Sequence, residues 1–267
     1  MKFETLLFEK GDGVATITLN RPQRHNAINW TMDRELGQAW TDVKADPQVT
    51  VVIVTGAGER AFCTGFDMDF QSRGEAAPEP RADAGHVQLH FTAIQNRCWK
   101  PVITAVNGMT TGGGLHFIAD SDIVICAEDA TFFDNHVRVG MVSATEPVSL
   151  VRRIPFEAVM RMALMGGAER MSAQRAHQLG MVSEVLPKER LLPRAVEIAQ
   201  MLLANSPAAM MRSKKAVWGS LDHGLDKGLE YGWSVLGGQT GHPDQAEGPR
   251  AFVEKRKPRW APPPPEV

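Results

Sequence analysis

The order of apolar and polar positions predicts a β-hairpin near the start of the chain. Residues 5–9 and 14–19 are rich in apolar and β-branched side chains, and the turn-forming stretch Gly11-Asp12-Gly13 separates them. Pro22 follows the second run. It ends the strand, because proline has no amide hydrogen to donate to a neighbouring strand.

Up to about residue 200, buried strands alternate with glycine-containing loops and helices. Apolar side chains recur at helical spacing between residues 31 and 46, at Met32, Leu36, Trp40 and Val43. Four apolar runs predict strands, at residues 51–55, 102–106, 123–127 and 131–133. Loops rich in glycine and small residues follow the first two runs, at residues 56–69 and 108–114. We also predict helices over residues 86–98 and 113–119.

Beyond residue 140 the periodicity is mainly helical. Helical spacing recurs over residues 156–165, 172–179, 192–203, 207–218, 225–236 and 243–256. A short strand is predicted at residues 181–185, and the proline run 262–265 should be extended or disordered. The resulting prediction is an α/β core over residues 1–200 and a helical C-terminal region over residues 201–267 with a proline-rich tail. This region should pack on the core or on a neighbouring subunit.

Composition narrows the function classes. The chain has 267 residues, of which 43% are hydrophobic and 22% charged, so it can bury a core. A net charge of −2 argues against a nucleic-acid surface. Cys63, Cys98 and Cys126 form no CxxC pair, which excludes a disulfide scaffold or zinc ribbon and favours a cytoplasmic location. No apolar run reaches the roughly 18 residues of a membrane span, and Glu4 argues against a secretory signal.

Two loops carry the candidate chemistry, residues 61–68 and 106–114. Glycines in such loops let the backbone approach a ligand closely and let amide groups point in one direction. The second loop also leads into a helix N-terminus, which favours negative charge. If the loops converge, their amides could form an oxyanion hole. Alternatively, each loop is an ordinary turn between a strand and a helix.

Several common catalytic patterns are absent. The sequence lacks GxxxxGK[ST], GxGxxG and GxSxG, so nothing indicates a phosphate-binding loop or a nucleophile elbow. His86 and His90 are four residues apart, but Val87 follows His86 where HExxH requires glutamate. A polar helix face explains these two histidines best, and we expect no metal site.

The motifs in these loops resemble those of the crotonase superfamily, also called the enoyl-CoA hydratase/isomerase family. Five groups of residues appear in the family's order, and the likeness covers essentially residues 3–260. They are Asn20-Arg21-Pro22 with Asn26-Ala27-Ile28; residues 61–67; Val106-Asn107-Gly108 through Gly112-Gly113-Gly114 and Ser121-Asp122; Met171-Ser172-Ala173 with Gly180-Met181-Val182; and residues 251–258.

The resemblance implies a crotonase-like spiral of β-β-α units with a helical C-terminal trimerisation region. It implies a homotrimer or a dimer of trimers, and an acyl-CoA thioester as substrate. The backbone amides of Phe66 and Gly113 would bind the thioester oxygen and stabilise an enolate-like intermediate. No cofactor beyond the CoA moiety, no nucleic acid and no membrane is implied.

The same resemblance implies a CoA-binding surface. The adenine and pantetheine would lie along Cys63, Thr64, Gly65, Asp67 and Met68, near Arg24 and Ala27. Lys255 or Lys257 would reach the CoA phosphates, from this chain or from a neighbouring subunit. Alternatively, these two lysines belong to a solvated helix end.

The sequence departs from the family at the two expected catalytic glutamates, since His116 and His136 occupy those positions. An imidazole can accept or donate a proton near pH 7, so two histidines could still divide the acid and base roles. Glu146 lies in the loop where isomerases of the family place their acid, and it is a third candidate. Asp134 could orient His136.

Three hypotheses remain open. The first is an enzyme of the hydratase/isomerase type that uses the two histidines. The second is a C–C bond hydrolase of a β-dicarbonyl substrate, because relatives that cleave such substrates look similar around residues 134–136. The third is a catalytically weak CoA-binding relative, in which one or both histidines are structural.

Overall fold

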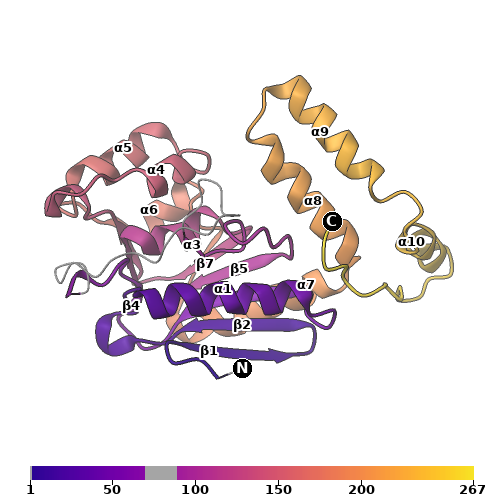
Figure 1. The fold of residues 1–267 in the computed structure, drawn as a ribbon, viewed down its shortest axis with the longest axis horizontal. Coiled ribbons are helices and arrows are strands. Elements are labelled where there is room, and N and C mark those ends of the chain that lie inside the picture. The colour runs from indigo at the N-terminus through magenta and orange to yellow at the C-terminus, as the bar shows by residue number, and fades with distance from the viewer. Residues whose placement is uncertain (1, 70–88) are drawn as a thin grey trace.

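The computed structural model describes residues 2–69 and 89–267. Its larger sheet has the strand order β1-β2-β3-β5-β7-β10 (Figure 1). These strands are β1 (Leu6–Gly11), β2 (Val14–Leu19), β3 (Val51–Gly56), β5 (Val102–Val106), β7 (Ile123–Ala127) and β10 (Glu184–Leu186). The pair β1 and β2 is the predicted antiparallel hairpin, and the remaining neighbours are parallel.

A smaller sheet has the order β4-β6-β8-β9. It contains β4 (Ala61–Cys63), β6 (Met109–Thr111), β8 (Thr131–Phe133) and β9 (Met171–Ser172). Strands β4, β6 and β8 each follow a strand of the larger sheet, namely β3, β5 and β7. This repetition matches the predicted spiral. Part of each glycine-rich loop is a strand of the smaller sheet, namely β4 in the first loop and β6 in the second.

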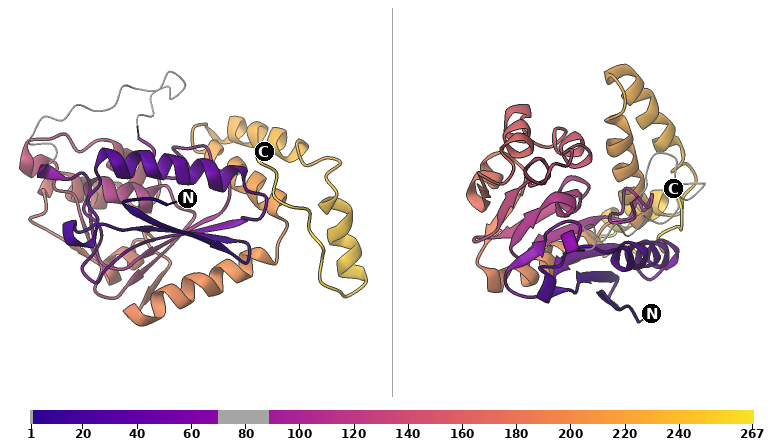
Figure 2. Two further views of the ribbon diagram at one scale, coloured as in Figure 1. Left: turned by 60° about the horizontal axis from the view of Figure 1, so that its bottom comes forward. Right: turned by 60° about the vertical axis from the view of Figure 1, so that its left-hand side comes forward.

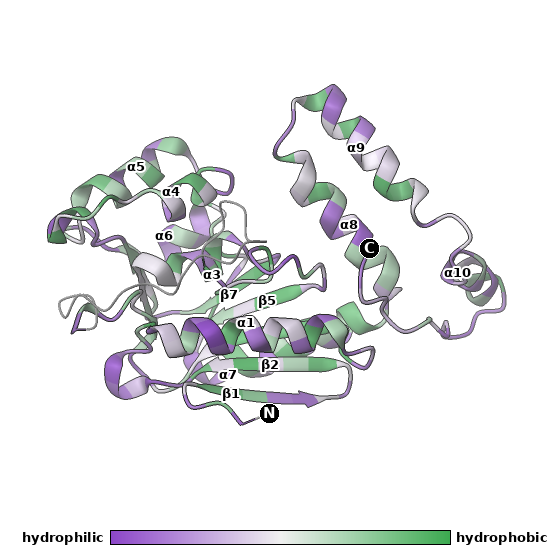
Figure 3. Cartoon of the chain, in the orientation of Figure 1, coloured by the Kyte–Doolittle hydropathy of each residue, from purple (hydrophilic) through white to green (hydrophobic). Residues whose placement is uncertain are grey.

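Helices cover both faces of the larger sheet (Figure 2). The helix α1 (Trp30–Ala45) buries its apolar stripe on one face, and α7 (Lys188–Leu203) covers the other. The β3 side chains alternate between the two cores, with Val52 facing the first cluster and Ile53 the second. Figure 3 shows the hydrophobic residues concentrated along these central strands.

The remaining helices lie to either side of the sheet. They are α3 (His116–Ala119), α4 (Thr145–Leu150), α5 (Phe156–Met165), α6 (Ala173–Gln178), α8 (Pro207–Ser220), α9 (Leu225–Gly237) and α10 (Asp244–Val253), with the short 3-10 turns η1 (Pro22–Arg24), η2 (Gly112–Leu115) and η3 (Val137–Val139). The helices α8, α9 and α10 extend away from the sheet (Figure 1). Among the described residues, no helix is long and apolar enough to cross a membrane.

The helix predicted for residues 86–98 is wrong where it can be checked. Residues 86–88 lie outside the described residues, and residues 89–98 contain no helix but a turn at residues 93–97. The Gln95 carboxamide accepts hydrogen bonds from two backbone amides of this segment, and the Asn96 carboxamide donates to two of its carbonyls. These side chains compete with helical backbone bonds, and Arg97 has a positive φ of 51°.

Two further details differ from the prediction. The strand expected at residues 181–185 lies later, at Glu184–Leu186, and α4 was not expected. The proposed boundary at residue 200 falls within α7, so the division into two parts stays a prediction.

Candidate active site

The two glycine-rich turns meet at Gly65 and Gly113. A Cβ atom built on Gly65 would lie 2.8 Å from the amide nitrogen of Gly113, which is closer than real Cβ contacts. Gly65 also has a φ of 77°, a left-handed conformation that side chains disfavour. Glycine at residue 65 therefore lets the turn after β4 and the turn after β6 contact each other.

Backbone hydrogen bonds fix the first turn. The amide of Ile28 donates to the carbonyl of Gly65 over 2.7 Å, and the amide of Asp67 donates to the carbonyl of Ile28 over 2.8 Å. Since neighbouring residues of an extended strand point their amides to opposite edges, the amide of Phe66 faces away from Ile28. Phe66 is thus held rigidly with its amide directed away from this pairing.

His116 is the first residue of α3 and directly follows the second glycine turn. The residue is only 4% exposed, and its ring packs edge-on against Phe91 with 5.9 Å between centroids. Its Nε2 atom lies 3.5 Å from Oε1 of Glu146 and 3.4 Å from the hydroxyl of Thr145. The helix α4 supplies both partners, so it positions a carboxylate against this imidazole.

His136 is held by Asp134, which is 1% exposed. One carboxylate oxygen of Asp134 lies 2.8 Å from the ring Nδ1 of His136 and accepts its backbone amide as well, while Ser143 donates to the other oxygen. The hydrogen bond that the His136 ring donates to Asp134 raises the pKa of His136, assisted by the charges of Asp134 and Glu146. Burial acts to raise the pKa of Asp134, but the hydrogen bonds from His136 and Ser143 outweigh it and lower that pKa.

The His136 ring also faces the second glycine turn. A Cβ atom built on Gly112 would lie 3.5 Å from Cε1 and 3.8 Å from Nε2 of His136. Because Nδ1 is bonded to Asp134, Nε2 is the nitrogen left for a ligand. The structure therefore brings the His136 ring close to the Gly112–Gly113 backbone.

Glu146 connects the two histidines. Donor atoms of Asp134, His136 and Glu146 all lie within 4.8 Å of one another, and Glu146 also contacts His116. Glu146 is 5% exposed, so water screens the interaction of its carboxylate with the two imidazoles only weakly. This donor set could also hold a divalent metal ion. The four side chains form one acid–base cluster, in which Asp134, Glu146 and His116 are buried and His136 is partly exposed.

Most of the predicted CoA-binding residues line one cavity of about 740 Å³ next to this cluster. The cavity residues that were predicted are Arg24, Ala27, Thr64, Asp67, Met68 and Phe66. Cys63 and Gly65 lie buried beneath its surface, and burial raises the pKa of the Cys63 thiol to about 12. Cys63 therefore stays a neutral thiol at physiological pH.

Sequence reasoning missed the opposite wall of this cavity. Arg138 in η3 and Arg170 before β9 line it. Arg21 was quoted only as part of a motif, yet its guanidinium lies 2.9 Å from the Asp67 carboxylate, and Arg24 pairs with Asp69 at 2.8 Å. The position of Arg138, two residues after His136, was the one signal that could have pointed to this wall.

Lys255 and Lys257 are not brought to this cavity within the chain. They follow α10, which Figure 1 places at the opposite end of the molecule from α4 and α5. A role for them at the CoA phosphates requires a neighbouring subunit and stays a prediction.

Comparisons with known proteins identify the family of the chain. The family model of enoyl-CoA hydratase/isomerase matches residues 9–263. A solved enoyl-CoA hydratase/isomerase from Mycobacterium paratuberculosis is 41% identical, with a TM-score of 0.88 over 97% of this chain and 98% of that one. An enoyl-CoA hydratase from Mycobacterium marinum is 34% identical, with a TM-score of 0.86 over 96% of this chain and 98% of that one.

Curated relatives also match nearly the whole chain. A carnitinyl-CoA dehydratase from Salmonella arizonae is 33% identical over 264 residues, which cover 96% of this chain and 98% of the relative. The family match over nearly the whole chain, the shared fold and the ordered motifs lead to one conclusion. The chain belongs to the enoyl-CoA hydratase/isomerase family, the crotonase superfamily, and is an enzyme of that type.

Proposed function

We propose that this enzyme adds water to, or removes it from, the C2–C3 bond of an acyl-CoA thioester, with His116 and His136 as its acid–base groups. The observation that carries the proposal is the cluster in which the buried Glu146 lies between the two imidazoles, beside the glycine turns. The names of the relatives, enoyl-CoA hydratase and carnitinyl-CoA dehydratase, describe the two directions of such a reaction.

In this proposal the amides of Phe66 and Gly113 bind the thioester oxygen. Negative charge develops on that oxygen as the substrate becomes enolate-like. Backbone donors that are already fixed stabilise this charge without reorganisation. The contact between Gly65 and Gly113 and the orientation of the Phe66 amide support a shared oxyanion site.

The two histidines take different parts. His136 has Nδ1 committed to Asp134, so its neutral ring presents a lone pair at Nε2 and can activate a water molecule for attack at C3. The proton of that water passes to His136, and a protonated His116 next to Glu146 delivers a proton to C2 and is left neutral. In dehydration the same groups exchange these roles. No cofactor beyond the CoA moiety enters the proposal.

The pH dependence of turnover tests this division. His136 must be neutral to act as the base, so kcat/KM should fall as the pH drops through its pKa, which lies above the ordinary value of about 6.5. Asp134→Asn removes the partner that raises this pKa. The fall of kcat/KM at acidic pH should therefore occur at a lower pH than in the wild type. The maximal rate should also drop at least about tenfold, because the ring loses its fixed tautomer.

The matched control is Asp129→Asn, which removes an exposed carboxylate that pairs with Lys188. Its pH profile should follow that of the wild type. If kcat/KM of the Asp134 variant falls over the same pH range as that of the wild type, this result would contradict His136 as the base.

A second candidate reaction is hydrolysis of a C–C bond in a β-dicarbonyl substrate. The chain of hydrogen bonds from Ser143 through Asp134 to His136 favours it, because such a dyad can also activate water toward a carbonyl carbon. Mass spectrometry separates the two reactions. Hydration of an enoyl-CoA gives one product heavier by one water, whereas C–C hydrolysis of a β-ketoacyl-CoA or β-diketone gives two fragments. Binding of CoA with neither product would support a catalytically weak relative.

We further propose that the chain forms a homotrimer or a dimer of trimers through its C-terminal helices. Trp233 in α9 is 71% exposed and Phe252 in α10 is 86% exposed, and α9 buries none of its residues within the chain. Large exposed apolar faces favour association.

The three cysteines are buried and unpaired, which supports the predicted cytoplasmic location.

Sedimentation velocity should therefore give a species of at least three times the 29.3 kDa chain mass. The double variant Trp233→Glu/Phe252→Glu should sediment as a monomer, because it places charges in the apolar contact. Leu7→Glu on the edge strand β1 is the matched control and should leave the assembly intact. A monomeric wild type at micromolar concentration would contradict the trimer.

A further inference from the structure

The two carboxylates of the acid–base cluster, Asp134 and Glu146, are buried without a lysine or arginine beside them. They are 1% and 5% exposed, and in the described part of the chain their ion-pair partners are the imidazoles of His136 and His116. Buried charges are normally paired with an opposite charge or bind a metal. When both imidazoles are neutral, the cluster holds two negative charges and no positive one, so it attracts a cation.

The donor atoms of the cluster lie close enough together to surround one ion. A carboxylate oxygen of Asp134, a carboxylate oxygen of Glu146 and a ring nitrogen of His136 all lie within 4.8 Å of one another. No other three histidine, cysteine or acidic side chains among the described residues do so. Zn²⁺ binds such atoms at roughly 2.0–2.2 Å in a tetrahedron, so its ligands lie roughly 3.3–3.6 Å apart. A closure of at most about 1.5 Å would therefore bring all three donors onto one ion.

A fourth donor points into the same space. Nε2 of His116 lies 3.5 Å from Oε1 of Glu146 and 3.4 Å from the hydroxyl of Thr145. Both distances exceed the usual hydrogen-bond length of about 2.7–3.2 Å. The residue is 4% exposed, and its Nδ1 is buried with no hydrogen-bond partner among the described residues. Because buried polar atoms almost always have a partner, His116 is under-bonded, and an ion on Glu146 would engage its Nε2.

Neighbouring hydroxyl groups hold the two carboxylates as they do in metal sites. Ser143 donates to Oδ2 of Asp134 over 2.7 Å, and Thr145 donates to Oε2 of Glu146 over 3.1 Å. Such bonds fix the orientation of a ligating carboxylate. The side chain of His136 is 19% exposed, so an ion can enter the cluster from solvent at this ring.

We propose that Asp134, His136 and Glu146 bind a divalent transition-metal ion, and that the bound ion inhibits the enzyme. Nε2 of His116 is its fourth ligand. Mixed nitrogen and oxygen donors favour an ion such as Zn²⁺ over Mg²⁺, which prefers oxygen donors. The inhibition rests on the proposed function, because a ligated imidazole can no longer accept or deliver a proton. The sequence predicted no metal site, since Glu146 meets the other donors only when α4 packs on α3.

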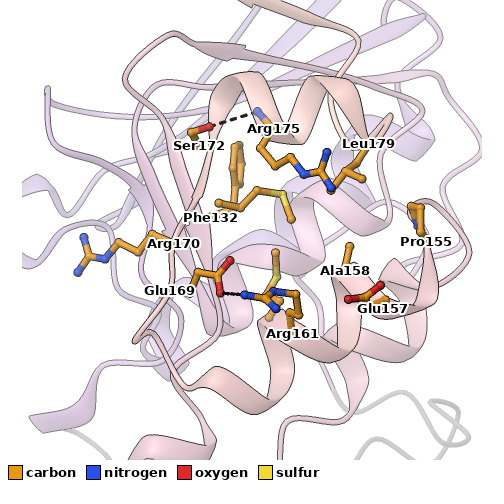
Figure 4. Close-up of a pocket in the computed structure, with 12 residues that line it drawn as sticks. Phe132, Pro155, Glu157, Ala158, Arg161, Glu169, Arg170, Ser172, Arg175 and Leu179 are labelled. Carbon is orange, nitrogen blue, oxygen red and sulfur yellow. Dashed lines mark hydrogen bonds and ion pairs between the residues drawn. The ribbon is translucent and has the colours of Figure 1, made fainter.

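Isothermal titration calorimetry of the chelator-treated enzyme with ZnCl₂ tests the site. The wild type is compared with Glu146→Gln, which removes the carboxylate shared by the imidazoles, and with His136→Gln, which removes a nitrogen donor. Glu169→Gln is the matched control, because Glu169 is a carboxylate that pairs with Arg161 on the wall of a separate pocket (Figure 4). A parallel titration with MgCl₂ measures non-specific attraction of a divalent charge.

The wild type and the Glu169 variant should bind one Zn²⁺ per chain, and each cluster variant should bind it at least about tenfold more weakly. Zn²⁺ should also raise the unfolding temperature of the wild type, because the ion binds the folded site. Equal Zn²⁺ affinity in the wild type and in either folded cluster variant would overturn the site. Absence of saturable Zn²⁺ binding to the wild type, or equally tight binding of Mg²⁺, would overturn it as well.

Activity assays separate the inhibition from the proposed function. With an enoyl-CoA, saturating Zn²⁺ should lower the kcat of the wild type and of the Glu169 variant at least about 10²-fold, and excess EDTA should restore it. Unchanged activity with Zn²⁺ shown by calorimetry to be bound would overturn the inhibition. Zn²⁺ binding that depends on Glu146, in a metal-free enzyme without hydration activity, would support the metal site and contradict the proposed function.

Discussion

Replacing His136 with glutamine should lower kcat/KM for an enoyl-CoA by at least about 10²-fold, the usual scale of general acid–base catalysis. Glutamine can keep a hydrogen bond to Asp134 but cannot carry a proton to or from water. His116→Gln should cause a loss of similar size, because each imidazole serves one half of the proton transfer. Steady-state kinetics across the pH range measures both effects.

The matched control for these variants is His177→Gln. His177 lies in α6, where its Nδ1 contacts the carbonyl of Val182, outside the cluster. The His177→Gln variant should retain wild-type rates. Wild-type rates in both the His116 and the His136 variants would remove the two histidines from the mechanism. Loss in one variant alone would leave Glu146 to provide the second acid–base group.

Gly65→Ala should lower kcat by about 10² to 10³-fold, the effect of losing an oxyanion donor. The added methyl group would lie 2.8 Å from the amide nitrogen of Gly113, so it must push the two glycine turns apart. The φ of 77° at this residue adds backbone strain. Both effects separate the amides of Phe66 and Gly113.

Thermal unfolding of the same variant distinguishes loss of catalysis from loss of the fold. Gly11→Ala is the matched control, since nothing lies within 4 Å of its Cβ position and its backbone is not left-handed. It should keep full activity. A folded Gly65 variant with unchanged kcat would contradict the proposed oxyanion site.

The parts of the fold set by local sequence were predictable. The hairpin has its turn at Asp12 and Gly13, both with positive φ, and α5 matches its apolar spacing from Phe156 to Met165. The central strands are apolar because both faces are buried. Residues 89–98 were not predictable from spacing, because amide side chains there replace the helical backbone bonds.

The candidate site was likewise predictable only in part. Ordered motifs indicated the glycine turns, His116 and His136, which lie near the ends of the strands they follow. Asp134 bonds to His136 because β8 ends at Phe133, and the chain then turns instead of alternating. Arg138 and Arg170 were not predicted, since they come to one cavity only when the loops after β8 and α5 pack together.

The position of Glu146 between the imidazoles also needed the tertiary structure. Its helix α4 has only six residues, with Pro147 in its first turn, and sequence periodicity does not reveal such a short helix. Its contact with His116 spans 30 residues of sequence. The family resemblance suggested this loop, but packing of α4 on α3 decides which atoms Glu146 meets.

A crystal structure with a slowly reacting enoyl-CoA thioester bound would locate the thioester oxygen and the acyl carbons. We expect the thioester oxygen about 3 Å from the amide nitrogens of both Phe66 and Gly113. C2 and C3 should face His116 and His136. A thioester oxygen bound elsewhere, or acyl carbons directed away from both imidazoles, would contradict this expectation.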